Sequence, residues 1–125
     1  MRLAVLLSIY LVTPACAETP TSFLATFEAA AGVPGNPLRG ANFFTSRHGG
    51  EWSCASCHTD NPMAGGRHAT TGKAIKPLAP RTNAERFTDA AKVDKWFRRN
   101  CNDVLGRECY AGEKADVLAF LFNGK

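Results

Sequence analysis

The sequence predicts an all-α domain of short helices, and three observations lead to this prediction. Apolar residues recur at helical spacing in several segments, and no segment shows the alternation typical of a half-buried strand. Capping residues, proline and glycine stand at the ends of these segments. The chain has 125 residues, of which 45% are hydrophobic. This length and composition suit one globular domain and exclude a disordered or collagen-like chain.

The first 17 residues have the pattern of a secretory signal peptide. Arg2 gives a positive start, an apolar run follows over residues 3–12, and Ala15-Cys16-Ala17 resembles a small-residue cleavage site. The apolar run is too short for a membrane-spanning helix. We therefore expect cleavage after Ala17, a periplasmic location without membrane insertion, and a single domain over residues 18–125.

The charge balance argues against one class of function, the binding of nucleic acid. Lys and Arg number 15 and Asp and Glu number 11, so the formal net charge is +4 at pH 7. This mild positive charge, without a long basic tract, does not indicate nucleic-acid binding. Four cysteines follow the signal segment. Disulfides persist outside the cytoplasm, so these cysteines can pair there or serve chemistry.

Helix signals recur along the chain. Residues 21–31 form an alanine-rich candidate that Gly32 closes. Asn36-Pro37 predicts an N-cap followed by proline at the first helical position, and this second helix should end near His48-Gly49-Gly50. Residues 59–82 are rich in Gly, Pro and Thr and predict a loop.

Two more helices are expected in the second half of the chain. Thr88-Asp89 is a suitable cap for a helix that runs to about Asn102. Residues 113–122 have the apolar spacing of a final helix. We find no internal repeats.

Cys54-Ala55-Ser56-Cys57-His58 has the spacing of a c-type haem attachment site. The two thiols would add to the vinyl groups of the porphyrin, and the next residue would supply an imidazole to the iron. A thioredoxin-like redox pair lacks its βαβ context here. A zinc site lacks a second pair at suitable spacing, because Cys101 and Cys109 are too far apart in sequence. We therefore predict one haem c with His58 as its proximal ligand.

The helix pattern resembles the class I cytochrome c fold, in which an N-terminal and a C-terminal helix cross at a small residue. The residues that resemble this contact, and that would be core residues in any case, are Gly40, Phe44, Val117, Phe120 and Leu121. Pro77 resembles the loop proline whose carbonyl accepts the Nδ1 proton of the proximal histidine, with Pro80 close by.

No ordinary sixth iron ligand is evident. Met63 lies five residues after His58, so an extended link spans at most about 18 Å and would have to run round the macrocycle. His48 and His68 would each need an awkward loop to reach the iron. Their favoured interpretation is a surface or hydrogen-bonding histidine. A conventional His/Met cytochrome is therefore disfavoured.

Asn100 is a single amide on an otherwise apolar helix face. That face consists of Val93, Trp96, Phe97, Asn100, Cys101 and Val104. A buried amide needs a hydrogen bond or a metal, because it is costly without a partner. Trp96 and Phe97 are candidates for the wall of a dry distal pocket.

Cys101 and Cys109 directly follow this amide. A disulfide is the default for them in an oxidising compartment, and closing this short loop would constrain the chain by about 2–3 kcal/mol. Such a bridge either only stabilises the fold or also controls the position of Asn100.

The sequence resembles the small oxygen-binding monohaem cytochromes c of the SHP type (sphaeroides haem protein), within the class I cytochrome c superfamily. The resemblance covers most of the domain and is weakest over residues 18–39. The motifs that carry it are Cys54-Ala55-Ser56-Cys57-His58, Thr71-Gly72-Lys73, Pro77-Leu78-Ala79-Pro80, Arg86-Phe87-Thr88-Asp89, Lys92-Val93-Asp94-Lys95-Trp96-Phe97-Arg98-Arg99-Asn100-Cys101, Val104-Leu105-Gly106-Arg107 and Cys109.

The resemblance implies a haem attached through Cys54 and Cys57, His58 as proximal ligand, and a Cys101–Cys109 disulfide. It also implies that Asn100 binds ferric iron and leaves on reduction. Ferrous iron would then bind O2, NO or CO.

The resemblance further implies electron donation from a dihaem cytochrome c, fed by a membrane b-type cytochrome. A nitric oxide dioxygenase or an oxygen-reducing side activity is compatible with this chemistry. The alternatives are a plain electron carrier that keeps both axial ligands, and a gas sensor without turnover.

Overall fold

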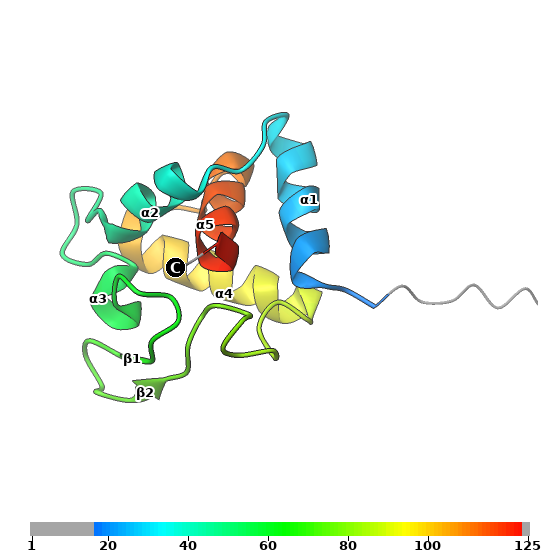
Figure 1. Ribbon diagram of the computed structural model, residues 1–125. Coiled ribbons are helices and arrows are strands. Elements are labelled where there is room, and N and C mark those ends of the chain that lie inside the picture. The colour runs from blue at the N-terminus through cyan, green and yellow to red at the C-terminus, as the bar shows by residue number, and fades with distance from the viewer. Residues whose placement is uncertain (1–16, 124–125) are drawn as a thin grey trace, which may run out of the picture.

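The computed structural model describes residues 17–123, which fold into short helices and one small hairpin (Figure 1). The predicted signal peptide, apart from Ala17, lies outside the described residues. The elements in chain order are α1 (Pro20–Ala31), α2 (Pro37–Thr45), α3 (Ala55–His58), β1 (Gly66–Arg67), β2 (Ala74–Ile75), α4 (Ala90–Leu105) and α5 (Ala111–Asn123). None of these helices is long and apolar enough to cross a bilayer.

The prediction of a mostly helical domain is confirmed, with one correction. Residues 59–82, expected as loop, contain the antiparallel pair β1–β2, in which Gly66 faces Ile75 and Arg67 faces Ala74. Each strand has two residues. Strands this short have no room for an alternating pattern, so the sequence does not signal them.

The predicted end of α1 at Gly32 and the predicted N-cap of α2 at Asn36 both form, and α1 has in addition an N-cap that was not predicted. Thr19 and Ser22 make a reciprocal capping box at α1, and Gly32 ends the helix in the left-handed conformation, with φ at 71°. The Asn36 side chain accepts hydrogen bonds from two backbone N–H groups of α2. This helix ends at Thr45, earlier than expected. Thr45 and Ser46 bond back to the carbonyls of the preceding turn with their hydroxyls.

The later helices are longer than predicted. Asp89 caps α4 by accepting from the N–H of Lys92, and the helix continues to Leu105 before Gly106 closes it in the left-handed conformation. The last helix begins two residues before the predicted start at Glu113. The Glu113 carboxylate reaches back to the N–H of Tyr110 and so lies in the first turn.

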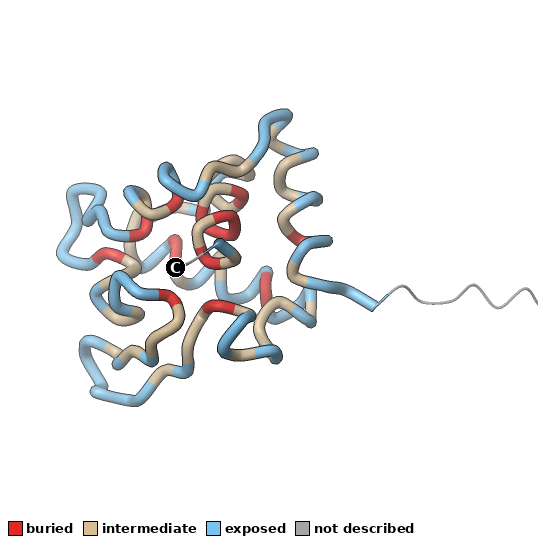
Figure 2. The backbone as a smooth tube through the Cα atoms, viewed as in Figure 1, coloured by how far each residue is buried: buried red, intermediate tan, exposed pale blue. Residues whose placement is uncertain are grey.

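The core is organised around α5, which lies between α1 and α2 and packs against both (Figure 1). Figure 2 shows a concentration of buried positions along this helix. Leu118 is fully buried, and Val117 and Leu121 are buried beside it. The rings of Phe44 and Phe120 are 5.4 Å apart between centroids. The predicted crossing of two helices therefore exists.

Gly40 permits this crossing. A Cβ atom on Gly40 would lie 1.9 Å from the carbonyl oxygen of Asp116 and 2.8 Å from the Cβ of Phe120. No side chain fits there unless the helices move apart. The crossing is further fixed by Arg39, whose guanidinium forms a two-point contact with the Asp116 carboxylate.

Gly40→Ala is expected to destabilise the protein by about 1–3 kcal/mol, because a methyl group must be forced between two helix backbones. Gly112→Ala is the matched control. Its added Cβ would meet only the Ala31 side chain, at 3.9 Å. Denaturant unfolding should show Gly112→Ala as neutral or slightly stabilised, and equal loss in both variants would contradict the close approach at Gly40.

Candidate haem-binding site

The two motif cysteines and the histidine share a single helical turn. Cys54 precedes α3 in helical conformation, and its carbonyl accepts from the N–H of His58 at 3.1 Å. Ser53 and Ser56 stabilise this turn reciprocally, because each backbone N–H donates to the other residue's hydroxyl, at 2.9 and 3.2 Å. Residues three apart on a helix are neighbours, so the two thiols lie on the same face.

The β1–β2 hairpin packs directly against this turn. A Cβ on Gly66 would lie 2.0 Å from the Cys57 carbonyl oxygen and 2.9 Å from the Cα of His58. The N–H of Ala69 also contacts the Cys57 sulfur at 3.3 Å. Glycine is therefore required at position 66, and the hairpin holds the motif turn through backbone contacts.

The protonation state of Cys54 argues against a redox pair. Cys54 and Cys57 are both free thiols and partly buried. Burial raises the pKa of Cys54 to about 11, with a smaller contribution from the neighbouring Cys57. A reactive cysteine pair needs a lowered pKa. Cys54 is instead a neutral thiol, the form suited to addition to a vinyl group.

The His58 imidazole is neutral. Burial lowers its pKa to about 4, and the charge of Arg86 acts in the same direction. The ring lies 6.2 Å from the ring of Phe44 and makes no hydrogen bond within residues 17–123. Neutral imidazole is the form that binds a metal.

The expected hydrogen bond from His58 to Pro77 is not formed. The Pro77 carbonyl instead accepts from Asn83 Nδ2 at 3.1 Å and from Arg86 Nε at 2.9 Å. A carbonyl oxygen has two lone pairs, and these two donors use both.

The other candidate ligands have local structural roles. His48 is exposed, and its Nε2 hydrogen-bonds to the Phe43 carbonyl at 2.8 Å. The Nδ1 of His68 accepts from the N–H groups of Thr70 and Thr71, each at 3.2 Å. These are the hydrogen-bonding histidines that we favoured from the sequence. Met63 lies partly buried in the loop before β1.

The residues on the predicted face of α4 differ in their burial and contacts. Val93 and Cys101 are buried. Phe97 turns toward α1, where its ring meets Phe27 edge-on at 5.6 Å, so the structure places it in the helix packing. Trp96 stays 45% exposed, one turn before Asn100. The Asn100 side chain is partly buried and makes no hydrogen bond in the described part of the chain.

A disulfide joins Cys101 and Cys109 behind this face. A second link, which the sequence reasoning missed, runs beside it. Arg107 binds Glu113 through both guanidinium ends, at 2.9 and 2.8 Å, and its charge lies 4.3 Å from the Tyr110 ring centroid. The disulfide and this ion pair both join the end of α4 to the start of α5.

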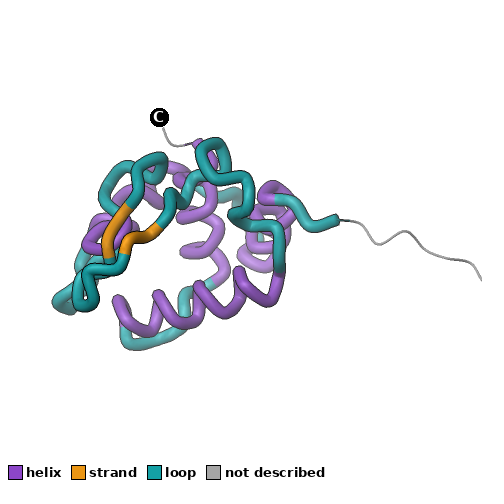
Figure 3. The backbone as a smooth tube through the Cα atoms, turned by 90° about the horizontal axis from the view of Figure 1, so that it is seen from below, coloured by secondary structure: helices purple, strands orange, loops and turns teal. Residues whose placement is uncertain are grey.

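These features together fit a haem. They supply two free thiols on one turn, a neutral imidazole without a hydrogen-bond partner, and on α4 an amide without a hydrogen-bond partner in the described part of the chain. Large apolar side chains also remain exposed at Trp52 and Trp96. In Figure 3, α4 runs along one edge of the molecule, while the hairpin and α3 lie on another side. Cys101 and Cys109 are already paired and so are not zinc ligands for this turn.

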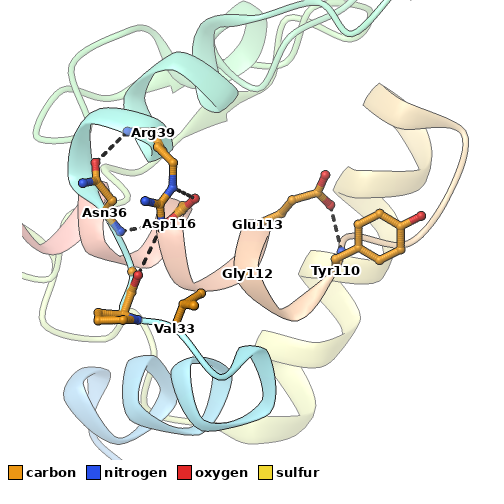
Figure 4. A pocket seen from close by; sticks show the side chains of 9 residues that line it. Val33, Asn36, Arg39, Tyr110, Gly112, Glu113 and Asp116 are labelled. Atoms are coloured by element: carbon orange, nitrogen blue, oxygen red, sulfur yellow. Dashed lines mark hydrogen bonds and ion pairs between the residues drawn. The ribbon is translucent and has the colours of Figure 1, made fainter.

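A groove of about 740 Å³ lies elsewhere and contains none of these residues (Figure 4). It is open, and it lies between the α1–α2 loop and the start of α5. Its carboxylates are already bound, since Asp116 pairs with Arg39 and Glu113 accepts from Tyr110. We assign it a structural role.

Comparisons with known proteins show which proteins this chain resembles. Residues 30–121 match the family described as "Domain of unknown function (DUF1924)". The cytochrome c-type protein SHP of Cereibacter sphaeroides is 47% identical over 122 residues, which are 93% of this chain and 94% of that protein.

Solved structures agree with this match. The structure of oxidised SHP, described as an oxygen-binding cytochrome c, has a TM-score of 0.79 at 45% identity, over 86% of this chain and 98% of that one. The solution structure of cytochrome c'' from Methylophilus methylotrophus, reported with insights into haem-ligand detachment, has a TM-score of 0.71 at 38% identity, over 83% and 92%. These matches confirm the cytochrome c-type fold.

The Arg107–Glu113 pair should give a defined acid dependence of stability. Hydrogen bonds from Arg107 lower the pKa of Glu113. Because the pKa of Glu113 is lower in the folded state, the ion pair stabilises the protein fully above the unfolded-state pKa, about 4.3. This stabilisation is lost as the pH falls through the folded-state pKa of Glu113. Glu113→Gln should therefore lower the free energy of unfolding by about 1 kcal/mol at pH 7, and the difference from wild type should shrink below about pH 4.

Urea unfolding of both proteins across this pH range measures the effect. Glu108→Gln is the control, because the exposed Glu108 carboxylate accepts no hydrogen bond within residues 17–123. A Glu113→Gln effect of the same size at pH 7 and at pH 3 would show that the ion pair is not its cause.

Proposed function

The chain belongs to the family of SHP-type cytochromes c, and from this premise we propose that it is a periplasmic monohaem cytochrome c with a detachable sixth ligand. His58 would hold the iron through its imidazole, and Asn100 would offer its amide oxygen as a further ligand to ferric iron and release it on reduction. When bound, the haem supplies a one-electron couple and, in the ferrous state, an open coordination position for O2, NO or CO.

Cys54, Cys57 and His58 are the residues that would hold the haem. The support for this assignment is their common helical turn, the neutral state of thiol and imidazole, and the backbone contact at Gly66 that fixes the turn. Membership of a cytochrome c family supports it further. The hairpin contacts the backbone of this turn at Gly66, and we propose His58 as the ligand that is retained in both redox states.

The main support for this function is the Asn100 amide on α4, which has no hydrogen-bond partner within residues 17–123. A carboxamide oxygen is a hard and weak ligand, which suits Fe(III) better than the softer Fe(II). No other side chain within residues 17–123 hydrogen-bonds to this amide, so its oxygen is not already engaged by the protein. The relatives support a detachable ligand, since one is described as oxygen-binding and the other through haem-ligand detachment.

The remaining functional details follow from the resemblance and are part of the proposal. The electron donor is a dihaem cytochrome c that is itself reduced by a membrane b-type cytochrome. A nitric oxide dioxygenase activity is compatible with an open ferrous site, since nitric oxide and oxygen would give nitrate with the one electron that Fe(II) supplies as it becomes Fe(III). The competing function is plain electron transfer with both axial ligands retained.

Visible spectra of the holoprotein test the proposal. The ferric protein should be low-spin, and anaerobic reduction should give a high-spin form that takes up carbon monoxide. Asn100→Ala should make the ferric form high-spin, because it removes the sixth ligand. Asn102→Ala is the matched control, since Asn102 is an exposed amide on the same helix.

Two results would count against this assignment. A ferric spectrum that Asn100→Ala leaves unchanged would exclude Asn100 as the ligand. A low-spin ferrous protein that resists carbon monoxide would favour the plain electron carrier.

The disulfide should control the exchange of Asn100. Replacing both Cys101 and Cys109 by Ser is expected to cost about 2–3 kcal/mol of stability, as the short loop loses its constraint. It should also speed binding of added azide to the ferric iron, because the turn after Asn100 loosens. Stopped-flow mixing measures this rate, and a rate equal to that of wild type would leave the disulfide with a structural role alone.

A further inference from the structure

The solvent side of α4 carries cations without acidic partners. Lys95, Arg98 and Arg99 are exposed there, together with the amide of Asn102. Within residues 17–123 none of these three cations forms an ion pair. Arg107, just after the same helix, by contrast binds a carboxylate at two points. We call Lys95, Arg98, Arg99 and Asn102 the basic face.

The basic face is concave and open to solvent. Its four side chains line a groove of about 560 Å³. Their spacing of three and four residues puts them on one side of the helix. Val93 and Cys101, the buried residues of α4, lie on another side. In Figure 3, α4 runs along an edge of the molecule, where a partner can approach it.

The arrangement of these charges is unfavourable for the isolated helix. Like charges three or four residues apart repel each other, and Lys95 has such neighbours in both Arg98 and Arg99. The ring of Trp96 keeps two of the charges close together, since Lys95 Nζ and Arg99 Cζ both lie 5.7 Å from its centroid. Binding of carboxylates to this face would relieve the repulsion.

The acidic residues around the basic face favour a protein as its partner. Asp94 and Asp103 flank the face along α4, and Glu108 lines the same groove. A uniform polyanion, such as nucleic acid or an anionic membrane, is repelled by such a border. Recognition of anionic lipids also uses clusters of about four to eight cations. A protein can place its carboxylates against the cations alone and leave the border to solvent.

We propose that the basic face of α4 is a docking surface for an acidic surface of a partner protein. Carboxylates of the partner supply the missing ion pairs of Lys95, Arg98 and Arg99, and the amide of Asn102 donates a further hydrogen bond. Arginine is enriched at protein interfaces, which agrees with this role. The basic face contains none of the proposed haem ligands. The proposal therefore goes beyond the proposed function and does not depend on it.

Calorimetric titration of the purified holoprotein with a synthetic peptide tests the docking surface. The probe is a helical peptide with glutamates at i and i+4 spacing, and the same peptide with glutamine at these positions is its control. The glutamate peptide alone should bind, with an affinity that falls as salt is added, because exposed charges are screened. Lys95→Glu combined with Arg98→Glu should weaken its binding about tenfold.

Lys73→Glu combined with Arg81→Glu is the matched control variant, because it changes the net charge equally at two exposed cations outside the basic face. It should bind the glutamate peptide as wild type does. Equal weakening in both double variants would overturn the proposal, since overall charge would then explain the binding. Wild type that binds phosphatidylglycerol vesicles but not the peptide, or that binds neither, would also overturn it. Arg98→Gln combined with Arg99→Gln adds no acid and decides the question if the first variant does not fold.

Discussion

The close approach of α2 and α5 at Gly40 is the constraint on which the rest of the structure depends. The helix backbones meet there with no room for a Cβ atom. The chain leads from α2 to the motif turn α3, and α4 leads into α5 through a loop that the disulfide closes. The crossing therefore sets where the motif turn and the helix of Asn100 lie relative to each other.

The two sides of the site are built differently. The His58 side is held by backbone contacts, from Gly66 against the motif turn and from Pro62 to the 76–79 segment. The Asn100 side is a single amide without a hydrogen-bond partner in the described part of the chain. In the function proposed above, His58 is the retained ligand and Asn100 the exchanging one, and this difference between the two sides agrees with that proposal.

Local signals were enough to predict much of this fold. The caps at Asn36 and Asp89 and the motif spacing depend on neighbouring residues, and the structure has those helices with small shifts of their ends. The family resemblance is confirmed as well. The assignments of ligands to Cys54, Cys57, His58 and Asn100 remain predictions.

The features that sequence reasoning missed depend on contacts that reach beyond one helical turn. The β1–β2 pair has two residues per strand, and the donors to the Pro77 carbonyl come from six and nine residues further along the chain. The direction of Phe97 is set by Phe27, far away in sequence. Periodicity places a residue on a helix face, but it does not say which neighbour that face meets.

The pairing of α2 with α5 also bears on the order of folding. Arg39 and Asp116 are 77 positions apart, and Glu18 bonds to Ala90 across 72. Contacts this distant in sequence close large loops and slow the folding reaction. The core cannot form before α5 has been synthesised. Until then Cys54 and Cys57 stay in a segment without its native packing, and this interval is when their thiols are most accessible to modification.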